Sequence, residues 1–236
     1  MPPGALHGPD PACETPMPQA IIFDVDGTLV DSVDLHARSW QDAFRDFGHD
    51  IDARAIRGHI GKGRDQLMPV FLSKGNLDRQ GDAIAAHRSA LFKERYLPLV
   101  IAFPGVRDLF LRLRQDRRTI ALASSARDEE LEIYKRIAGI AELTDTQTSS
   151  DDAERSKPHP DIFHAALARL NGIEPRDTIV VGDTPYDAEA AGKAGLRTIG
   201  VLCGGFPEQD LRRTGCFAIY RDPADMLRRY EEWIDL

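Results

Sequence analysis

Long apolar segments are missing from this sequence of 236 residues, and no stretch approaches the ~20 residues that a membrane-spanning helix needs. Cysteine is scarce: there are three, with no Cys-x-x-Cys spacing, which favours a reducing compartment and argues against a zinc site. Lys and Arg form no long run and the net charge is −8, so neither nucleic acid nor an anionic membrane is expected as the main partner. We therefore expect a cytoplasmic globular protein, either a monomer or a small homo-oligomer.

A signal peptide is not expected either. Residues 1–16, MPPGALHGPDPACETP, are rich in Pro and Gly and contain no apolar core of the kind that secretory signals have. We predict a flexible tail over this range. Met17 stands just before the first predicted strand, and we hypothesise that it is the biological start.

Short apolar runs separated by helical patterns indicate the fold class. The run Ala20–Val25 is continuous rather than alternating, as expected for a strand that is buried on both faces. Helical patterns such as 160–170 and 185–194 stand between later runs. Strands that alternate with helices predict an α/β protein with a Rossmann-like parallel sheet and helices on both of its faces. The other predicted strands are Thr119–Ala123, Thr178–Val181, Thr198–Leu202 and, as the weakest candidate, Cys216–Tyr220.

The region after the first predicted strand has a different sequence pattern. Apolar residues within 33–47 recur every three or four positions, which predicts an amphipathic helix that Asp31 or Ser32 can cap. More helical patterns follow without strands. We therefore predict an inserted α-helical cap domain over residues 32–102 and a core domain over residues 17–31 and 103–236.

Two carboxylates follow the first predicted strand within the string IIFDVDGTLVDS, residues 21–32. Residues i and i+2 of an extended chain project to the same side, so Asp24 and Asp26 can face one site. The turn at Gly27 and Thr28 is predicted to leave its backbone N–H groups free to point at an anion. Parallel-sheet proteins bind ligands at the carboxyl ends of their strands, which is where this pair stands.

Polar residues also follow later strands. Ser124-Ser125 ends the second run, Gly182–Asp187 (GDTPYD) ends the third, and Lys157 precedes a proline and a helix start between them. If these strands are neighbours, carboxylates, hydroxyls and an ammonium meet at one site. Crowded carboxylates repel one another unless a cation lies among them, and a set of oxygen ligands suits Mg²⁺ best. A nucleophilic carboxylate beside that ion points to phosphoryl transfer.

Taken in order, four motifs resemble those of the haloacid dehalogenase superfamily: DVDGT at 24–28, Ser124, Lys157 and GDTPYD at 182–187. The similarity covers nearly the whole chain, and the insertion resembles the helical cap of the subgroup that contains phosphoglycolate phosphatase and β-phosphoglucomutase. A dehalogenase lacks a carboxylate two residues after its nucleophile, because halide leaves without a proton. Asp26 therefore favours phosphate chemistry.

The resemblance implies a role for each motif residue. Asp24 would attack phosphorus and form an aspartyl-phosphate, and Asp26 would protonate the leaving alcohol and then activate water. Ser124 would hydrogen-bond the phosphoryl oxygens, and Lys157 would neutralise charge on the nucleophile and the phosphate. The implied Mg²⁺ ligands are the Asp24 carboxylate, the Asp26 backbone carbonyl, Asp183 and, either directly or as a supporting group, Asp187.

One cap segment and several loop residues are candidates for substrate binding. The segment Arg57–Arg64 holds three glycines and three fixed cations, and it either grips an anionic substrate or is a solvated turn between helices. His36 matches a histidine that assists the general acid in β-phosphoglucomutase, and a partly exposed helix histidine is the alternative. The predicted substrate-binding residues are Gly27, Thr28, Ser125, His36, Arg57, His59, Lys62 and Arg64.

These observations predict a Mg²⁺-dependent phosphatase for a small phosphorylated metabolite, with phosphoglycolate or a sugar phosphate as candidate substrates by analogy. The GDTPYD motif is the form common among phosphatases. Two alternatives stay open. One is a sugar phosphomutase of the β-phosphoglucomutase type, and the other is a binding or regulatory protein that has kept the fold and lost turnover.

Overall fold

The computed structural model describes residues 17–235. The predicted flexible tail, residues 1–16, lies outside the described residues, as does Leu236. Within the described part of the chain, no helix combines the length and the apolar character that crossing a membrane requires.

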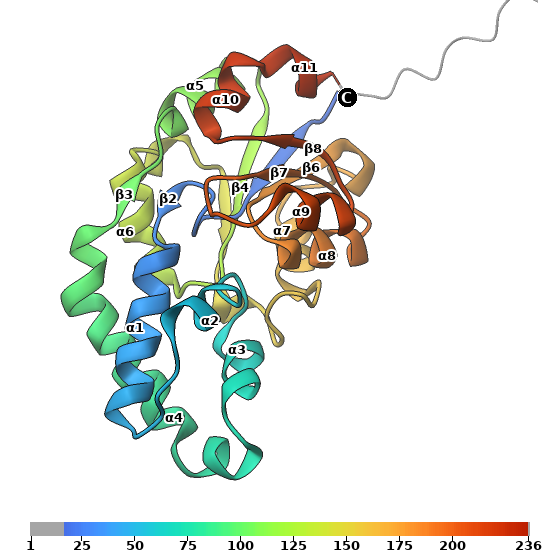
Figure 1. The fold of residues 1–236 in the computed structure, drawn as a ribbon. Coiled ribbons are helices and arrows are strands. Elements are labelled where there is room, and N and C mark those ends of the chain that lie inside the picture. Colours follow the sequence, from blue (N-terminus) through green and yellow to red (C-terminus); the bar gives the residue numbers. More distant parts are fainter. Residues whose placement is uncertain (1–16, 236) are drawn as a thin grey trace, which may run out of the picture.

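A six-stranded parallel sheet forms the centre of the core (Figure 1). Its strands are β1 (Ala20–Phe23), β4 (Thr119–Ala123), β5 (Thr146–Thr148), β6 (Thr178–Gly182), β7 (Arg197–Val201) and β8 (Cys216–Tyr220). The order is β5-β4-β1-β6-β7-β8, so β1 lies between β4 and β6. The predicted parallel sheet is confirmed. The sequence pattern does not predict β5, because its three residues, Thr-Gln-Thr, form no apolar run.

Helices cover both faces of the sheet. They are α5 (Val106–Gln115), α6 (Asp128–Ala138), α7 (Asp161–Ala168), α8 (Pro185–Lys193), α9 (Glu208–Arg213), α10 (Pro223–Arg228) and α11 (Tyr230–Ile234). Ile21 and Phe23 of β1 face a core that α5, α6, α10 and α11 complete, whereas Ala20 and Ile22 face α7 and α8. All four side chains are fully buried, which explains why this strand reads as a continuous apolar run.

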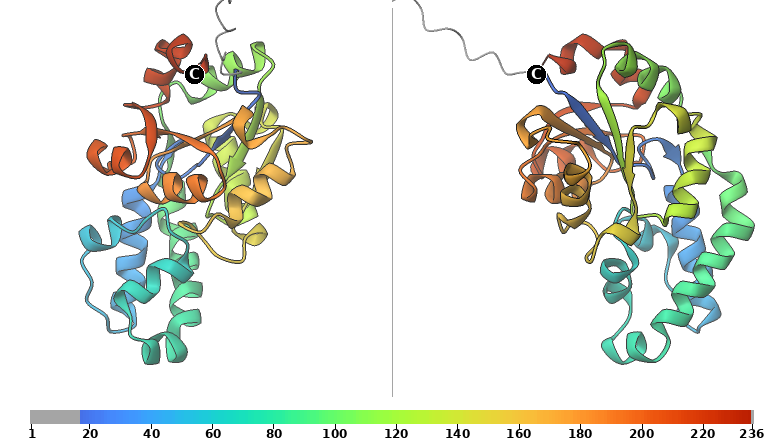
Figure 2. Two further views of the ribbon diagram at one scale, coloured as in Figure 1. Left: turned by 90° about the vertical axis from the view of Figure 1, so that its right-hand side faces the viewer. Right: turned by 180° about the vertical axis from the view of Figure 1, so that it is seen from behind.

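Four helices make up most of the insertion, which joins the core through two short strands (Figures 1 and 2). They are α1 (Val33–Asp46), α2 (Ala53–Arg57), α3 (Arg64–Phe71) and α4 (Lys74–Leu91), which continues as a π-helix over Phe92–Tyr96. The strands β2 (Val30–Asp31) and β3 (Ile101–Ala102) pair antiparallel, so the chain enters and leaves at adjacent points. We keep the predicted division and call residues 32–102 the cap, which has its own apolar cluster around Trp40 and Phe44.

The cap lies opposite the carboxyl ends of the sheet strands (Figure 2). Hydrogen bonds cross the seam between the two parts. The Tyr186 hydroxyl at the start of α8 donates to the Gly58 carbonyl of the cap at 2.6 Å, and the Ser125 hydroxyl after β4 donates to the Gly61 carbonyl at 3.4 Å. The loops that follow the strands therefore face the cap directly.

Candidate active site

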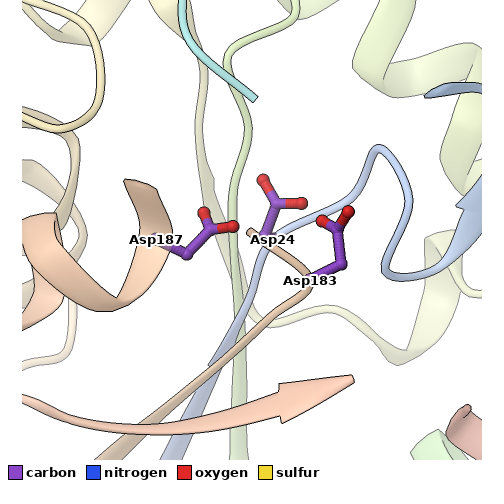
Figure 3. Close-up of side chains that lie close together, drawn as sticks. All are labelled: Asp24, Asp183 and Asp187. Carbon is purple, nitrogen blue, oxygen red and sulfur yellow. The ribbon is translucent and has the colours of Figure 1, made fainter. Parts of the chain in front are cut away.

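Three carboxylates meet where β1 and β6 end (Figure 3). Asp24 directly follows β1, Asp183 directly follows β6, and Asp187 lies in the first turn of α8. The two strands are parallel neighbours, with Phe23 beside Val181, so their ends reach the same edge of the sheet. The three residues each offer an oxygen within 4.8 Å of the others, and all three are buried.

Lys157 brings a buried positive charge to these carboxylates. Its Nζ lies 2.6 Å from Asp24 Oδ1 and 2.8 Å from Asp187 Oδ1, and it also donates to the Ala123 carbonyl at 3.0 Å. Burial lowers the pKa of Lys157, but Asp187 and Asp24 outweigh burial and raise this pKa above its ordinary value. The ammonium therefore stays charged, even though its side chain is only 1% exposed.

The three carboxylates carry more charge than one lysine balances. Burial raises the pKa of Asp24 to about 7, with Lys157 opposing the rise and Asp187 adding to it. Burial, and then the charge of Asp24, raise the pKa of Asp183 well above its ordinary value. Among residues 17–235, Asp183 Oδ2 has no hydrogen-bond partner although it is buried. A bound divalent cation would satisfy this oxygen and lower both pKa values, so the residues present fit a metal site.

Backbone packs so closely against Asp183 that two neighbouring positions require glycine. A Cβ on Gly27, whose φ is +82°, would lie 2.4 Å from Asp183 Oδ2, and a Cβ on Gly204 would lie 1.6 Å from the same oxygen. Both distances are far below van der Waals contact. Any side chain at these positions would displace the carboxylate.

The turn after β1 is closed on itself, which corrects one prediction. The Gly27 N–H donates to the Val30 carbonyl at 2.9 Å, and the Thr28 N–H donates to the Val25 carbonyl at 3.2 Å. Neither N–H is free to point at an anion, because both complete the turn that leads into β2. The Thr28 hydroxyl instead lies 3.1 Å from Asp24 Oδ2 and 3.2 Å from Asp183 Oδ1, so it links the two carboxylates.

The Asp26 carboxylate has different partners from the other three. Its Oδ1 accepts a hydrogen bond from Ser32 Oγ at 2.6 Å and lies 2.7 Å from His36 Nε2. Burial raises the pKa of Asp26, but His36, Ser32 and Arg88 outweigh burial and hold this pKa below its ordinary value. The Ser32 hydroxyl is thus used on Asp26, and α1 begins without the side-chain cap predicted from Asp31 or Ser32.

The two serines after β4 have different surroundings. Ser124 is fully buried, and its Oγ accepts a hydrogen bond from the Ala126 N–H at 3.0 Å. Its hydroxyl proton can still be donated, because a hydroxyl accepts and donates at once. Ser125 is half-buried and lines the cavity between core and cap.

A cavity of about 620 Å³ separates the carboxylates from the cap. Asp24, Asp26 and His36 line it on the side of the sheet and the hinge, and Lys62 and Arg64 line it from the cap. Lys62 Nζ lies 4.6 Å from the centre of the Tyr186 ring, which holds this ammonium at the seam. With Ser125 included, the structure therefore brings six of the predicted site residues to one cavity.

Two predicted cap residues do not line this cavity in the described structure. Arg57 turns to the seam, where Nε donates to Asp34 at 2.6 Å and Nη2 donates to the Gly204 carbonyl at 2.8 Å. His59 packs edge-on against Phe71, and its Nδ1 lies 3.1 Å from Lys62 Nζ. Arg57 thus bridges cap and core, and His59 contacts Lys62 without lining the cavity.

Three further cations line the cavity, and sequence reasoning misses them: Arg88, Lys93 and Arg127. The first two come from α4 and its π-helical continuation, and Arg127 immediately precedes α6. Arg88 donates to His36 Nδ1 and is therefore tied to the residue that contacts Asp26. No local pattern marks these residues, because each stands where a solvent-facing helix cation is also common.

Comparison with known proteins agrees with this geometry. The sequence profile described as haloacid dehalogenase-like hydrolase matches residues 21–201, which include both strand ends that carry the carboxylates. The chain belongs to this family. The haloacid dehalogenase-like hydrolases are enzymes, so the predicted family resemblance and the enzyme class are both confirmed.

Individual relatives align over most of the chain. "Probable phosphatase IndB" of Dickeya dadantii is 32% identical over 191 residues, which cover 80% of this chain and 83% of that protein. A phosphoglycolate phosphatase of Nitrosospira multiformis is 29% identical over 211 residues, which cover 86% of this chain and 92% of that protein. A solved hydrolase from Pseudomonas syringae matches with a TM-score of 0.80 at 26% identity, covering 91% of this chain and 99% of that one. The fold is that of these hydrolases.

Proposed function

We propose that this hydrolase is a Mg²⁺-dependent phosphatase that acts on a small phosphorylated metabolite through an aspartyl-phosphate intermediate. The cluster of Asp24, Asp183 and Asp187 around Lys157 carries the proposal. It combines a cation-binding set of oxygens with a carboxylate that can act as nucleophile, which phosphoryl transfer requires. Relatives that align over most of the chain are named as phosphatases, which supports the same reaction class.

Asp24, Asp183 and the backbone carbonyl of Asp26 would hold the Mg²⁺. Oxygen ligands suit this ion, and when bound it would neutralise charge on the phosphoryl oxygens. Asp187 already uses both of its oxygens: Oδ2 accepts from the Thr184 hydroxyl at 2.6 Å and Oδ1 pairs with Lys157. We therefore assign Asp187 the supporting role and leave the direct contacts to the other groups.

In the first half-reaction, a carboxylate oxygen of Asp24 attacks phosphorus. The new bond joins this oxygen to phosphorus, and the bond between phosphorus and the leaving alcohol breaks. Asp26 gives its proton to the leaving oxygen. Lys157 holds Asp24 through its 2.6 Å contact and balances the charge that builds up, while Ser124 donates to a phosphoryl oxygen.

In the second half-reaction, Asp26 takes a proton from water. The water oxygen attacks phosphorus, the bond to Asp24 breaks, and inorganic phosphate leaves. Both hydrogen bonds from Ser32 and His36 fall on Asp26 Oδ1, so Oδ2 is the oxygen that can carry the transferred proton. The low pKa of Asp26 is set in the free enzyme, and a phosphate dianion beside it would raise that pKa toward the value an acid needs.

The cap sets which metabolite enters. A cavity of about 620 Å³ accommodates a sugar phosphate as well as phosphoglycolate, because sites of this size hold ligands much larger than either. Lys62 and Arg64 are the predicted substrate-binding cations that line it. Closure of the cap would exclude bulk water from the aspartyl-phosphate.

A sugar phosphomutase is the second candidate. The 2.7 Å contact between His36 and Asp26 favours it, because β-phosphoglucomutase is the relative in which the resemblance gives this histidine a function. The two reactions share the first half and differ in which group accepts the phosphoryl. No observation in the described structure favours a member without turnover.

Phosphate release from a panel of phosphorylated metabolites tests the proposal. With Mg²⁺ present we expect release from at least one small monoester, loss of release with EDTA, and recovery when Mg²⁺ is returned. Conversion of β-glucose 1-phosphate into glucose 6-phosphate without phosphate release would establish the mutase instead. Activity that survives complete chelation would remove the metal from the proposal.

A further inference from the structure

A buried tyrosine lies beside the proton-transfer residues and has no part in the reaction described above. The Tyr134 hydroxyl, on the core helix α6, lies 3.2 Å from His36 Nε2 and donates to Glu130 Oε1 at 2.7 Å. The tyrosine is 1% exposed. Burial, and then the charges of Asp26 and Glu130, raise its pKa well above the ordinary value, so the hydroxyl keeps its proton.

The partners of His36 determine which ring nitrogen carries its proton. Arg88 is hydrogen-bonded to Nδ1, and a guanidinium has only donors, so Nδ1 must accept. A His36 N–H is therefore on Nε2. From Nε2 this proton faces two oxygens, Asp26 Oδ1 at 2.7 Å and the Tyr134 oxygen at 3.2 Å.

The hydroxyl of Tyr134 is oriented to accept from His36. Its only proton is used on Glu130, which leaves its lone pairs directed at the neighbouring Nε2–H. The His36 ring is also stacked on Phe92, with 4.1 Å between ring centroids, so it is fixed in plane as well as at both nitrogens. The ring therefore has one hydrogen-bonded orientation, in which its N–H is shared between Asp26 Oδ1, the nearer acceptor at 2.7 Å, and the Tyr134 oxygen at 3.2 Å.

We propose that Tyr134, with Glu130 as its acceptor, is a positioning residue that holds the His36 N–H on Asp26 for proton transfer to the leaving group. The inference deepens the proposed function and rests on it. His36 and Arg88 belong to cap helices α1 and α4, whereas Tyr134 and Glu130 belong to core helix α6. The contact between Tyr134 and His36 therefore joins the cap to the core at the residue that moves the proton.

Two substrates that differ in their leaving groups test this role. Nitrophenolate leaves without protonation, so p-nitrophenyl phosphate needs little help from Asp26, whereas glycerol 2-phosphate needs a proton on its alkoxide. For Tyr134→Phe we expect kcat on glycerol 2-phosphate to fall by about fivefold, the size of one hydrogen bond. Its KM, and kcat on p-nitrophenyl phosphate, should change less than twofold.

Matched variants separate positioning from structure. Tyr96→Phe removes another phenol that donates to a carboxylate, Asp42 at 2.5 Å, and should leave both substrates unchanged. Glu130→Gln keeps an acceptor for Tyr134 and should retain most of the glycerol 2-phosphate activity, whereas Glu130→Ala should resemble Tyr134→Phe. An equal fall on both substrates in Tyr134→Phe would overturn the proposal, since a general loss of structure acts on both.

A spectroscopic measurement keeps the inference testable if the wild-type protein hydrolyses neither substrate. In protein labelled with ¹⁵N-histidine, we expect His36 to show an Nε2–H signal with a slowly exchanging proton. Tyr134→Phe should shift this signal and speed its exchange, and Tyr96→Phe should not. An identical His36 signal in Tyr134→Phe would refute the positioning role, whereas absent hydrolysis across the whole metabolite panel, with the expected signals, would refute only the proposed function.

Discussion

The two walls of the cavity hold their charged groups differently. On the core side, Asp24 lines the cavity and Asp183 and Lys157 lie beside it; all three are at most 5% exposed, and Lys157 contacts Asp24 directly. On the cap side, Lys62 is half-buried over an aromatic ring, and Arg64 is exposed and pairs with a surface carboxylate at 3.3 Å. Fixed groups suit a reaction in which charge develops at one place, whereas adjustable groups suit recognition of different molecules. The comparison predicts chemistry in the core wall and selection in the cap wall.

The largest expected effect is on the core wall. Asp24→Asn removes the proposed nucleophile while keeping the shape of the side chain, so we expect kcat to fall by about 10⁴-fold or more. Phosphate release on a hydrolysed substrate measures it. Asp50→Asn, an exposed carboxylate of the cap, is the control and should retain full activity. Appreciable turnover by Asp24→Asn would contradict its role as nucleophile.

After metal removal, the carboxylates of the core wall should make the free energy of unfolding of the protein depend on pH. Burial raises the pKa of Asp24 from 3.8 to about 7, so between these values the folded protein binds a proton that the unfolded chain has lost. In EDTA the contribution of Asp24 to the free energy of unfolding should therefore fall as pH rises from 4 to 7, by about 2–4 kcal/mol. Denaturant unfolding at several pH values measures this loss. If excess Mg²⁺ leaves the pH dependence unchanged, these carboxylates are not its site.

Asp183→Asn isolates the repulsion among the carboxylates. The neutral amide relieves a buried charge whose Oδ2 has no partner in the described structure, so we expect the metal-free variant to melt about 2–6 °C above the wild type. The same change should abolish stabilisation by Mg²⁺. Asp187→Asn is the matched control: its carboxylate oxygens already have partners, so it should lower the melting temperature. A lower melting temperature for Asp183→Asn would argue against a cation site at these carboxylates.

The core wall could be predicted from the sequence because strand ends fix it. Once β1 and β6 are parallel neighbours, Asp24 and Asp183 must come together, and both strands are visible as apolar runs. What could not be predicted is how polar groups are used locally. The Gly27 N–H closes its own turn, and the Ser32 hydroxyl bonds Asp26 instead of capping α1. Sequence shows that a donor is present, whereas its partner depends on distances that only the folded chain sets.

The residues of the cap wall were harder to predict, because a long side chain on a helix can point in several directions. Within 57–64, the cations separate: Arg57 turns to the seam, whereas Lys62 and Arg64 line the cavity. Arg88 lines the same cavity from α4, far along the chain from Arg64. Only the packing of α4 against α1 brings it to His36, and no spacing rule in the sequence encodes that packing.

Lys62→Ala should show the selective role of the cap wall. The ammonium faces the cavity, and the loss of one charge-assisted contact with an anionic or hydroxylated substrate should raise KM about tenfold, with kcat changed less than threefold. Steady-state kinetics on the preferred substrate measures both constants. Lys74→Ala, an exposed cation at the start of α4, is the control and should change neither. A fall in kcat without a change in KM would indicate that Lys62 takes part in the chemical step and does not act mainly in substrate recognition.

The smallest effect is expected from Arg57→Ala, which tests whether Arg57 contacts the substrate or only joins the cap to the core. Arg57 donates to the carbonyl of Gly204, and that glycine packs against Asp183, so Arg57 links the cap to the backbone beside the proposed metal ligand. Its loss should loosen the seam and lower kcat/KM by about two- to fivefold, equally for all substrates, because no contact with substrate is removed. Kinetics on two substrates of different size measures this. A loss that depends strongly on the substrate would show that Arg57 reaches the cavity during turnover. The prediction that the segment 57–64 binds an anionic substrate through all three cations would then hold.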